Sequence, residues 1–100
     1  MYRKRRTYYE NEDYNLSLEE KDGLLFVHLI FFNVSKNIIK DISSKWNEIK
    51  EKCYWLGYEY IYTYTTDPRV PKLFDGWEPV TEVNYYGTKY EVIRWELKLS

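Results

Sequence analysis

The 100-residue chain has few of the residues that small proteins use for cross-links, metal sites and proton transfer. It contains one cysteine, Cys53, and one histidine, His28. A lone cysteine cannot form a disulfide within the chain, and such sparing use of cysteine is more typical of a reducing cytoplasm than of a secreted scaffold. One Cys and one His that lie far apart in the sequence match none of the usual zinc spacings. We therefore expect a cytoplasmic protein without a bound metal.

Long hydrophobic segments and a large net charge are also missing. The longest apolar run, 24–32, is interrupted by His28 and is well short of the roughly 20 residues that a membrane-spanning helix needs. The basic start is followed by no apolar segment, so we expect neither a secretory signal nor a membrane span. Lys+Arg 15 against Asp+Glu 16 leave a net charge of -1, which argues against attraction of nucleic acid by the protein as a whole.

Linkers and repeats are absent as well, and what remains is an aromatic-rich domain. No glycine-, serine- or proline-rich tract divides the chain, so residues 1–100 are predicted to form a single domain. Residues 1–13, basic and then acidic, form an N-terminal arm or an edge strand in this prediction. An aromatic content of 20%, including 12 tyrosines, supplies enough apolar surface to exclude a disordered chain.

The first half of the chain has the pattern of a hairpin. Residues 14–19 alternate between apolar and polar, and the Asp22-Gly23 pair suits a tight turn. The run 24–32 that follows is apolar on both of its faces, as in a strand that is covered on both sides. We therefore predict an antiparallel pair in which 24–32 is a central strand.

A helical period begins after Ser35. Ser35 or Asn33 can cap the start of this helix, and Gly57 can adopt the left-handed conformation that ends it. Cys53 lies on the apolar stripe, where cysteine acts as a small hydrophobe, so we interpret it as structural and not as a nucleophile. The stripe consists of Ile38, Ile39, Ile42, Trp46, Ile49, Cys53 and Leu56.

The second half of the chain completes the predicted sheet. The helix should connect the strand 24–32 to a parallel strand over 59–64, because a long crossover is required between parallel neighbours. A short helix is allowed from Pro68 to Phe74, and a closing hairpin follows around Tyr86-Gly87. The predicted fold class is α+β, a mixed and mostly antiparallel sheet with one long helix and one short helix.

This order of elements resembles the C-terminal two-thirds of the GNAT acyltransferase superfamily. The resemblance covers residues 14–99 and is best over 60–65 and 71–80, where a strand, a short helix and a Gly76-Trp77 step follow one another. Residues 90–97 are similar to the final strand of the family. The resemblance implies a partial GNAT-like fold. Because bacteriophages encode small proteins of this kind, it also implies a phage protein that acts in the host cytoplasm.

The residues that would serve acetyl transfer in this family are missing. The family places an Arg/Gln-x-x-Gly-x-Gly/Ala loop before its long helix to bind the pyrophosphate of acetyl-CoA, whereas the segment 32–38 has no glycine. The frequent glutamate base has no counterpart over 24–32, and the frequent tyrosine acid has none over 68–74. We interpret His28 as a structural residue, with a proton-transfer or binding role as the alternative. We thus predict no catalytic residue and no cofactor.

Two aromatic-rich groups are candidates for binding a partner. The basic arm combines cations with stacking faces, which suits single-stranded nucleic acid or an acidic protein surface, although the same cations could simply protect an edge strand. Alternation places the four tyrosines of 58–64 on one side of their strand, where they serve either core packing or an interface. The predicted partner-binding residues are Arg3, Arg5, Arg6, Tyr8, Tyr9, Tyr62, Tyr64 and Trp77.

Three functions remain open at this point. The leading hypothesis is a non-catalytic GNAT-like phage accessory protein that binds a macromolecule, such as an inhibitor of a host defence system. A protein partner is expected, and a homodimer is compatible with several aromatic anchors. The first alternative is an N-acetyltransferase that uses acetyl-CoA. The second is a nucleic-acid-binding protein that uses the basic arm.

Overall fold

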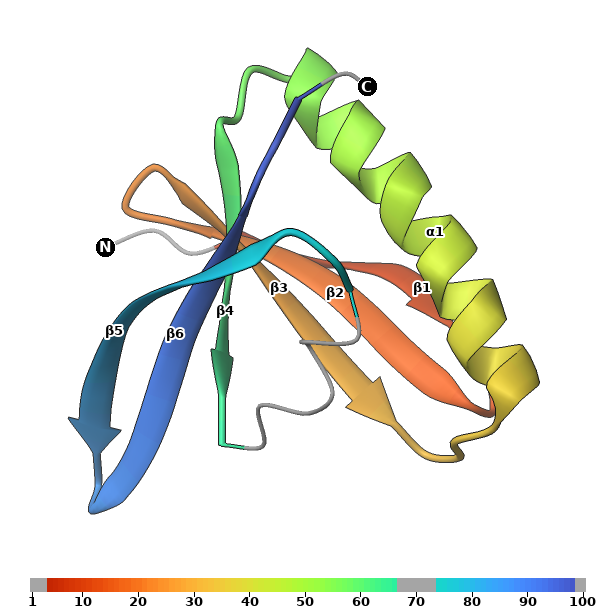
Figure 1. Cartoon of the computed structure of the whole chain (residues 1–100), viewed down its shortest axis with the longest axis horizontal. Coiled ribbons are helices and arrows are strands. Elements are labelled where there is room, and N and C mark those ends of the chain that lie inside the picture. Colours follow the sequence, from red (N-terminus) through yellow and green to blue (C-terminus); the bar gives the residue numbers. More distant parts are fainter. Residues whose placement is uncertain (1–3, 67–73, 99–100) are drawn as a thin grey trace.

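The computed structural model describes residues 4–66 and 74–98, which form a six-stranded sheet with one helix on one side (Figure 1). The order across the sheet is β1-β2-β3-β4-β6-β5, and only the neighbours β3 and β4 are parallel. The α+β class and the mostly antiparallel mixed sheet are therefore confirmed. The elements are β1 (Lys4–Glu10), β2 (Tyr14–Lys21), β3 (Leu24–Phe31), α1 (Lys36–Trp55), β4 (Tyr60–Thr65), β5 (Trp77–Tyr85) and β6 (Thr88–Glu96). Residues 68–73 of the short helix predicted from Pro68 to Phe74 lie outside the described residues, and Phe74 itself belongs to no helix.

Both predicted hairpins are confirmed, and their turns explain the pairing of the strands. Asp22 and Gly23 have φ values of 55° and 79°, and Tyr86 and Gly87 have φ values of 50° and 78°. Two consecutive residues with positive φ give a turn whose twist matches that of the flanking strands. Glycine at the second position adopts this conformation without the steric cost that a side chain would add.

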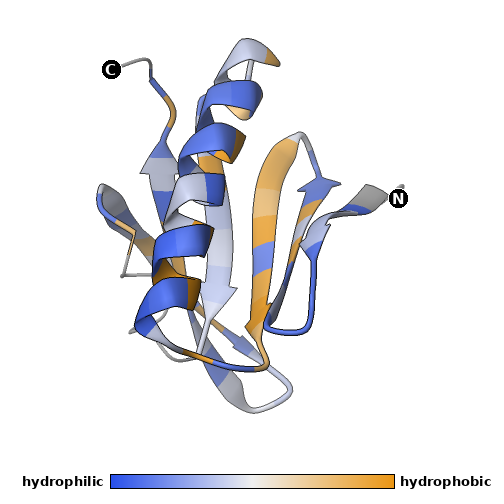
Figure 2. Ribbon diagram, turned by 90° about the vertical axis from the view of Figure 1, so that its right-hand side faces the viewer, coloured by the Kyte–Doolittle hydropathy of each residue, from blue (hydrophilic) through white to orange (hydrophobic). Residues whose placement is uncertain are grey.

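The helix begins and ends where the sequence predicts. The hydroxyl of Ser35 accepts a hydrogen bond from the amide of Ile38 (3.3 Å), and Gly57 has a φ of 97° just after the C-cap. The prediction for the apolar stripe is wrong at Leu56, whose side chain is 76% exposed. Leu56 is the C-cap residue, one position beyond the last residue of α1. In Figure 2, β3 is the most hydrophobic strand, and most of the helix is hydrophilic.

The core lies between α1 and one face of the sheet. The helix contributes Trp46, and the sheet contributes Trp95 from the strand whose alternation was predicted. Cys53 is also buried here, and this burial raises the pKa of its thiol to about 11, as expected for a cysteine that serves as a small hydrophobe. Fully buried aliphatic side chains in this core are Leu16, Ile42, Ile49, Ile61 and Ile93.

The prediction that two layers cover the central strand is wrong for the described part of the chain. Alternation directs Leu25 and Val27 of β3 toward α1, and Phe26, His28 and Ile30 to the opposite side. We call this opposite side the open face. Phe26 is buried there by tyrosine rings, but Ile30 is 49% exposed. The sheet therefore presents an apolar surface that α1 does not cover.

The raised pKa values of two tyrosine hydroxyls predict that the protein loses stability at alkaline pH. Burial, followed by the hydrogen bond to Asp41 (2.6 Å), raises the pKa of Tyr14 from 10.0 to about 12. The hydrogen bond to Glu20, followed by burial, raises the pKa of Tyr58 from 10.0 to about 12. Since the folded state holds these protons more tightly than the unfolded state, the contribution is complete below pH 10 and falls between pH 10 and 12.

Urea unfolding measured at intervals from pH 9 to pH 11.5 checks this expectation. The free energy of unfolding of the wild-type chain should decline above pH 10, and a Tyr14→Phe, Tyr58→Phe double variant should show a shallower decline. Equal slopes for the two proteins would show that these hydroxyls are not the cause.

Candidate functional site

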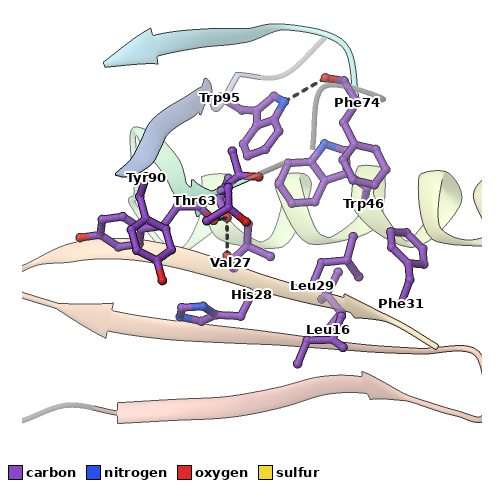
Figure 3. A pocket seen from close by; sticks show the side chains of 14 residues that line it. Leu16, Val27, His28, Leu29, Phe31, Trp46, Thr63, Phe74, Tyr90 and Trp95 are labelled. Carbon is purple, nitrogen blue, oxygen red and sulfur yellow. Dashed lines mark hydrogen bonds between the residues drawn. The ribbon is translucent and has the colours of Figure 1, made fainter. Parts of the chain in front are cut away.

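The two parallel strands separate toward their carboxyl ends. Within the described strands, β3 and β4 are in register at Leu25–Ile61 and Phe26–Tyr62 and not beyond. Past that point, the hydroxyl of Thr63 still donates a hydrogen bond to the carbonyl of Val27 (2.9 Å). A cavity of about 470 Å³ lies between the strands, and we call it the cleft (Figure 3). Its volume lies within the range of small-ligand sites.

Three aromatic rings form the wall of the cleft nearest to α1. The ring of Trp46 lies 5.2 Å from that of Phe74 and 4.8 Å from that of Trp95. The indole N–H of Trp95 donates to the carbonyl of Phe74 (3.1 Å), whereas the buried Nε1 of Trp46 has no acceptor in the described part of the chain. A buried donor without an acceptor costs about 1–3 kcal/mol.

A second hollow, which we call the hairpin groove, adjoins the cleft on the open face. It has a volume of about 680 Å³ and lies between the β2–β3 strands and the β5–β6 hairpin. The groove and the cleft share part of their lining. The shared residues are His28, Tyr64 and Tyr90. The other residues around the groove are Glu19, Lys21, Val83, Asn84 and Tyr85.

The tyrosines of β4 form the floor of the open face. The ring of Phe26 lies 5.0 Å from that of Tyr64 and 5.7 Å from that of Tyr62. Tyr64 is still 40% exposed. The prediction that Tyr58 shares this side is wrong, because Tyr58 precedes β4 and packs against the core cluster. The predicted residues Tyr62 and Tyr64 are therefore brought together on the open face.

A histidine–carboxylate pair lies at the junction of the cleft and the groove. His28 Nε2 is 3.2 Å from Glu19 Oε1, and the two side chains are 28% and 14% exposed. The sequence pattern alone placed no acid beside His28. The hairpin register pairs His28 with Ser17 and Phe26 with Glu19, so Glu19 is a diagonal neighbour on the same face. Such a carboxylate fixes the orientation of the imidazole and leaves its second nitrogen for a ligand.

The loop before α1 does not fit the pyrophosphate of acetyl-CoA. Every residue from Phe32 to Ile38 carries a side chain, which obstructs a close approach to the backbone. The amide of Ile38 is already used, because it donates to the hydroxyl of Ser35 (3.3 Å). The first turn of α1 therefore lacks the exposed, glycine-lined amides that a diphosphate requires.

The predicted arm is an edge strand over residues 4–10, and its aromatic rings are used within the fold. A bulge between Thr7 and Tyr9 shifts the register of β1. The ring of Tyr8 lies beneath Lys52 (5.1 Å), and that of Tyr9 lies beneath Lys45 (4.8 Å). The hydroxyl of Tyr9 also donates to Glu48 (3.1 Å). These contacts attach β1 to α1.

The remaining predicted residues are dispersed. Arg6 is exposed on β1, the side chain of Arg5 is not described, and Arg3 lies outside the described residues. Trp77 is half-buried against the core cluster, in register with the buried Trp95. Of the eight predicted residues, Tyr62 and Tyr64 both lie against Phe26 on the open face. Tyr64 also lines the cleft and the hairpin groove together with His28 and Tyr90, which the partner-binding prediction did not include.

Comparisons with known proteins found no match to this chain among protein-family models, curated proteins or solved structures. Within residues 4–66 and 74–98, no group of three or more His, Cys, Asp and Glu residues could hold a metal ion. No helix among those residues combines the length and hydrophobicity needed to span a membrane.

Proposed function

We propose that the chain is a non-catalytic, GNAT-like protein that binds a protein partner through the open face and the cleft. The uncovered apolar face of the central strand is the main support for this function. A strand with large apolar side chains on both faces normally lies between two layers. Here α1 supplies one layer, and a partner would supply the other.

The distribution of exposed apolar residues favours the same surface. Ile30, Phe32 and Val34 are exposed along the end of β3 and the loop after it, and Ile30 also lines the cleft. Tyr85 and Tyr86 are exposed at the tip of the β5–β6 hairpin. Large exposed apolar patches mark interaction sites, and tyrosine is enriched at protein interfaces.

An acetyltransferase is the second candidate, because a cleft between two separated parallel strands supports acyl-CoA binding in a GNAT-like fold. The glycine-free loop argues against it, since the segment 32–38 cannot bring bare backbone to the diphosphate. We therefore favour a partner-binding function without catalysis. Inhibition of a host defence system would be one form of such a function.

Site-specific photo-crosslinking tests the proposal in the cells that produce the protein. A photoreactive phenylalanine analogue at position 64 lies on the open face, and the same analogue at Asn47 lies on the exposed side of α1. We expect a discrete protein adduct from position 64 and none from position 47. Adducts from position 47 alone, or from neither position, would contradict the proposed surface.

A thermal-shift titration with acetyl-CoA separates the two candidate functions. A ligand at 100 times its dissociation constant stabilises a protein by about 2.7 kcal/mol, which is readily seen as a rise in Tm. We expect no saturable shift. A saturable shift accompanied by acetyl transfer to an amine would establish the acetyltransferase instead.

A further inference from the structure

Backbone N–H and C=O groups of β3, as well as side chains, face the cleft. The carbonyl of Val27 points toward β4, because the hydroxyl of Thr63 donates to it (2.9 Å). The amide of Phe32 points to the other side, because it donates to the carbonyl of Asp13 next to β2 (2.7 Å). Along a strand, the N–H and C=O groups of successive residues point alternately to the two neighbours. The backbone groups of Leu29 and Phe31 therefore face the cleft.

These groups lie beyond the point where β3 and β4 pair. In the described strands, the register between them ends at Phe26 and Tyr62, and Leu29 and Phe31 both line the cleft. Backbone N–H and C=O groups in a folded protein almost always have hydrogen-bond partners. The cleft thus presents a short length of strand edge inside the sheet, next to an apolar cavity.

The two outer edges of the sheet are less suited to adding a strand. A bulge interrupts β1 between Thr7 and Tyr9, and another interrupts β5 between Pro79 and Thr81. Bulges and proline protect an edge strand from pairing with other chains. The side of β3 that faces the cleft has neither a bulge nor a proline between Leu29 and Phe31.

We infer that the cleft binds an extended peptide segment of the partner, which pairs with the free side of β3 and inserts one apolar side chain beside Trp46. This inference rests on the proposed function and specifies the chemistry of the partner. Strand addition gives affinity through main-chain hydrogen bonds, and pockets for alternate side chains give specificity. The rings of Trp46, Phe74 and Trp95 line the cavity and form such a pocket.

A displayed library of random 12-residue peptides, selected on the purified full chain, tests the inference. We expect enriched peptides that share one large apolar residue. In a synthetic copy of the best peptide, N-methylation at alternate positions should weaken binding at least about tenfold, because each methyl group removes one hydrogen bond to β3. N-methylation at the intervening positions should leave the affinity unchanged. Uniform losses, or no loss at any position, would overturn strand pairing.

Two variants of similar size locate the peptide on the protein. Leu29→Trp would fill the cleft, whereas Leu24→Trp would place the same ring at the exposed end of β3. We expect Leu29→Trp to weaken peptide binding at least about tenfold and Leu24→Trp to bind as the wild type does. If Leu29→Trp does not fold, ¹⁵N NMR of the wild-type chain takes the place of this variant. We then expect the peptide to perturb the amide signals of Leu29 and Phe31.

The outcomes for the two proposals can be told apart. Failure to enrich any peptide, or perturbation that avoids Leu29 and Phe31, overturns the inference. A discrete adduct from position 64 in the crosslinking experiment would still support the proposed function in that case. Absence of that adduct counts against the proposed function itself.

Discussion

A Trp95→Ala variant should lose about 3–5 kcal/mol of its free energy of unfolding, which is the cost typical of truncating a buried tryptophan. Trp95 is 2% exposed, and its ring packs 4.8 Å from Trp46 and 6.4 Å from Phe74. Its indole N–H also holds the carbonyl of Phe74 (3.1 Å). Since domains of this size are stable by only about 5–15 kcal/mol, a large part of the total would be lost. Guanidinium chloride unfolding followed by circular dichroism measures the effect.

Trp55 provides a matched control within the same chain. It lies at the end of α1 and is 68% exposed, so Trp55→Ala removes the same side chain from a site with little burial. We expect a change within about 0.5 kcal/mol for this variant. If both variants unfold at the same denaturant concentration as the wild type, the assignment of Trp95 to the core is wrong.

An Ile30→Asp, Tyr64→Asp double variant should bind the partner at least about 30-fold more weakly than the wild-type chain. Both positions lie on the open face, and both side chains are substantially exposed. Because Tyr64→Asp also removes a ring stacked on Phe26, circular dichroism of the variant first checks that it is folded. An interface anchor contributes about 2 kcal/mol or more, which corresponds to this factor in Kd. Buried carboxylates without a partner would add to the loss. Biolayer interferometry with the crosslinked and identified partner gives the value.

The exposed side of α1 supplies the control for this experiment. Lys40→Asp together with Asn47→Asp also introduces two carboxylates, on a surface that the proposed function does not use. This variant should bind with unchanged affinity. A loss of similar size in both double variants would indicate a general effect of added negative charge and not a local interface.

Local signals in the sequence were sufficient for most of the fold. The Asp22-Gly23 and Tyr86-Gly87 pairs identify two hairpins because few residues tolerate consecutive positive φ values. Ser35 and Gly57 mark the ends of the helix because their chemistry satisfies its exposed backbone groups. The parallel pair follows from the length of the connection between the strands.

Other features depend on information that a residue pattern does not carry. The apolar pattern of β3 indicates that both faces of the strand are shielded from water. It does not tell whether the layer on the second face comes from the same chain or from a partner. Phe26 is covered by Tyr62 and Tyr64 from β4, whereas Ile30 is left exposed. Leu56 matched the helical period, yet the helix ends at this residue.

The candidate site was predicted in part. Alternation correctly placed Tyr62 and Tyr64 on one face, because both lie within β4. The pair of His28 and Glu19 was missed, since it depends on the register of the β2–β3 hairpin. That register could have been obtained by counting back from the two-residue turn at Asp22-Gly23, which fixes every facing pair.

Chemical-shift mapping of the ¹⁵N-labelled chain with the identified partner is the most direct test of the proposed binding surface. Binding at the open face and cleft predicts that the largest changes fall on the amides of β3 and β4, around Ile30 and Tyr64, with α1 little affected. Changes concentrated on the outward side of α1 or on β1, with β3 and β4 undisturbed, would contradict the account.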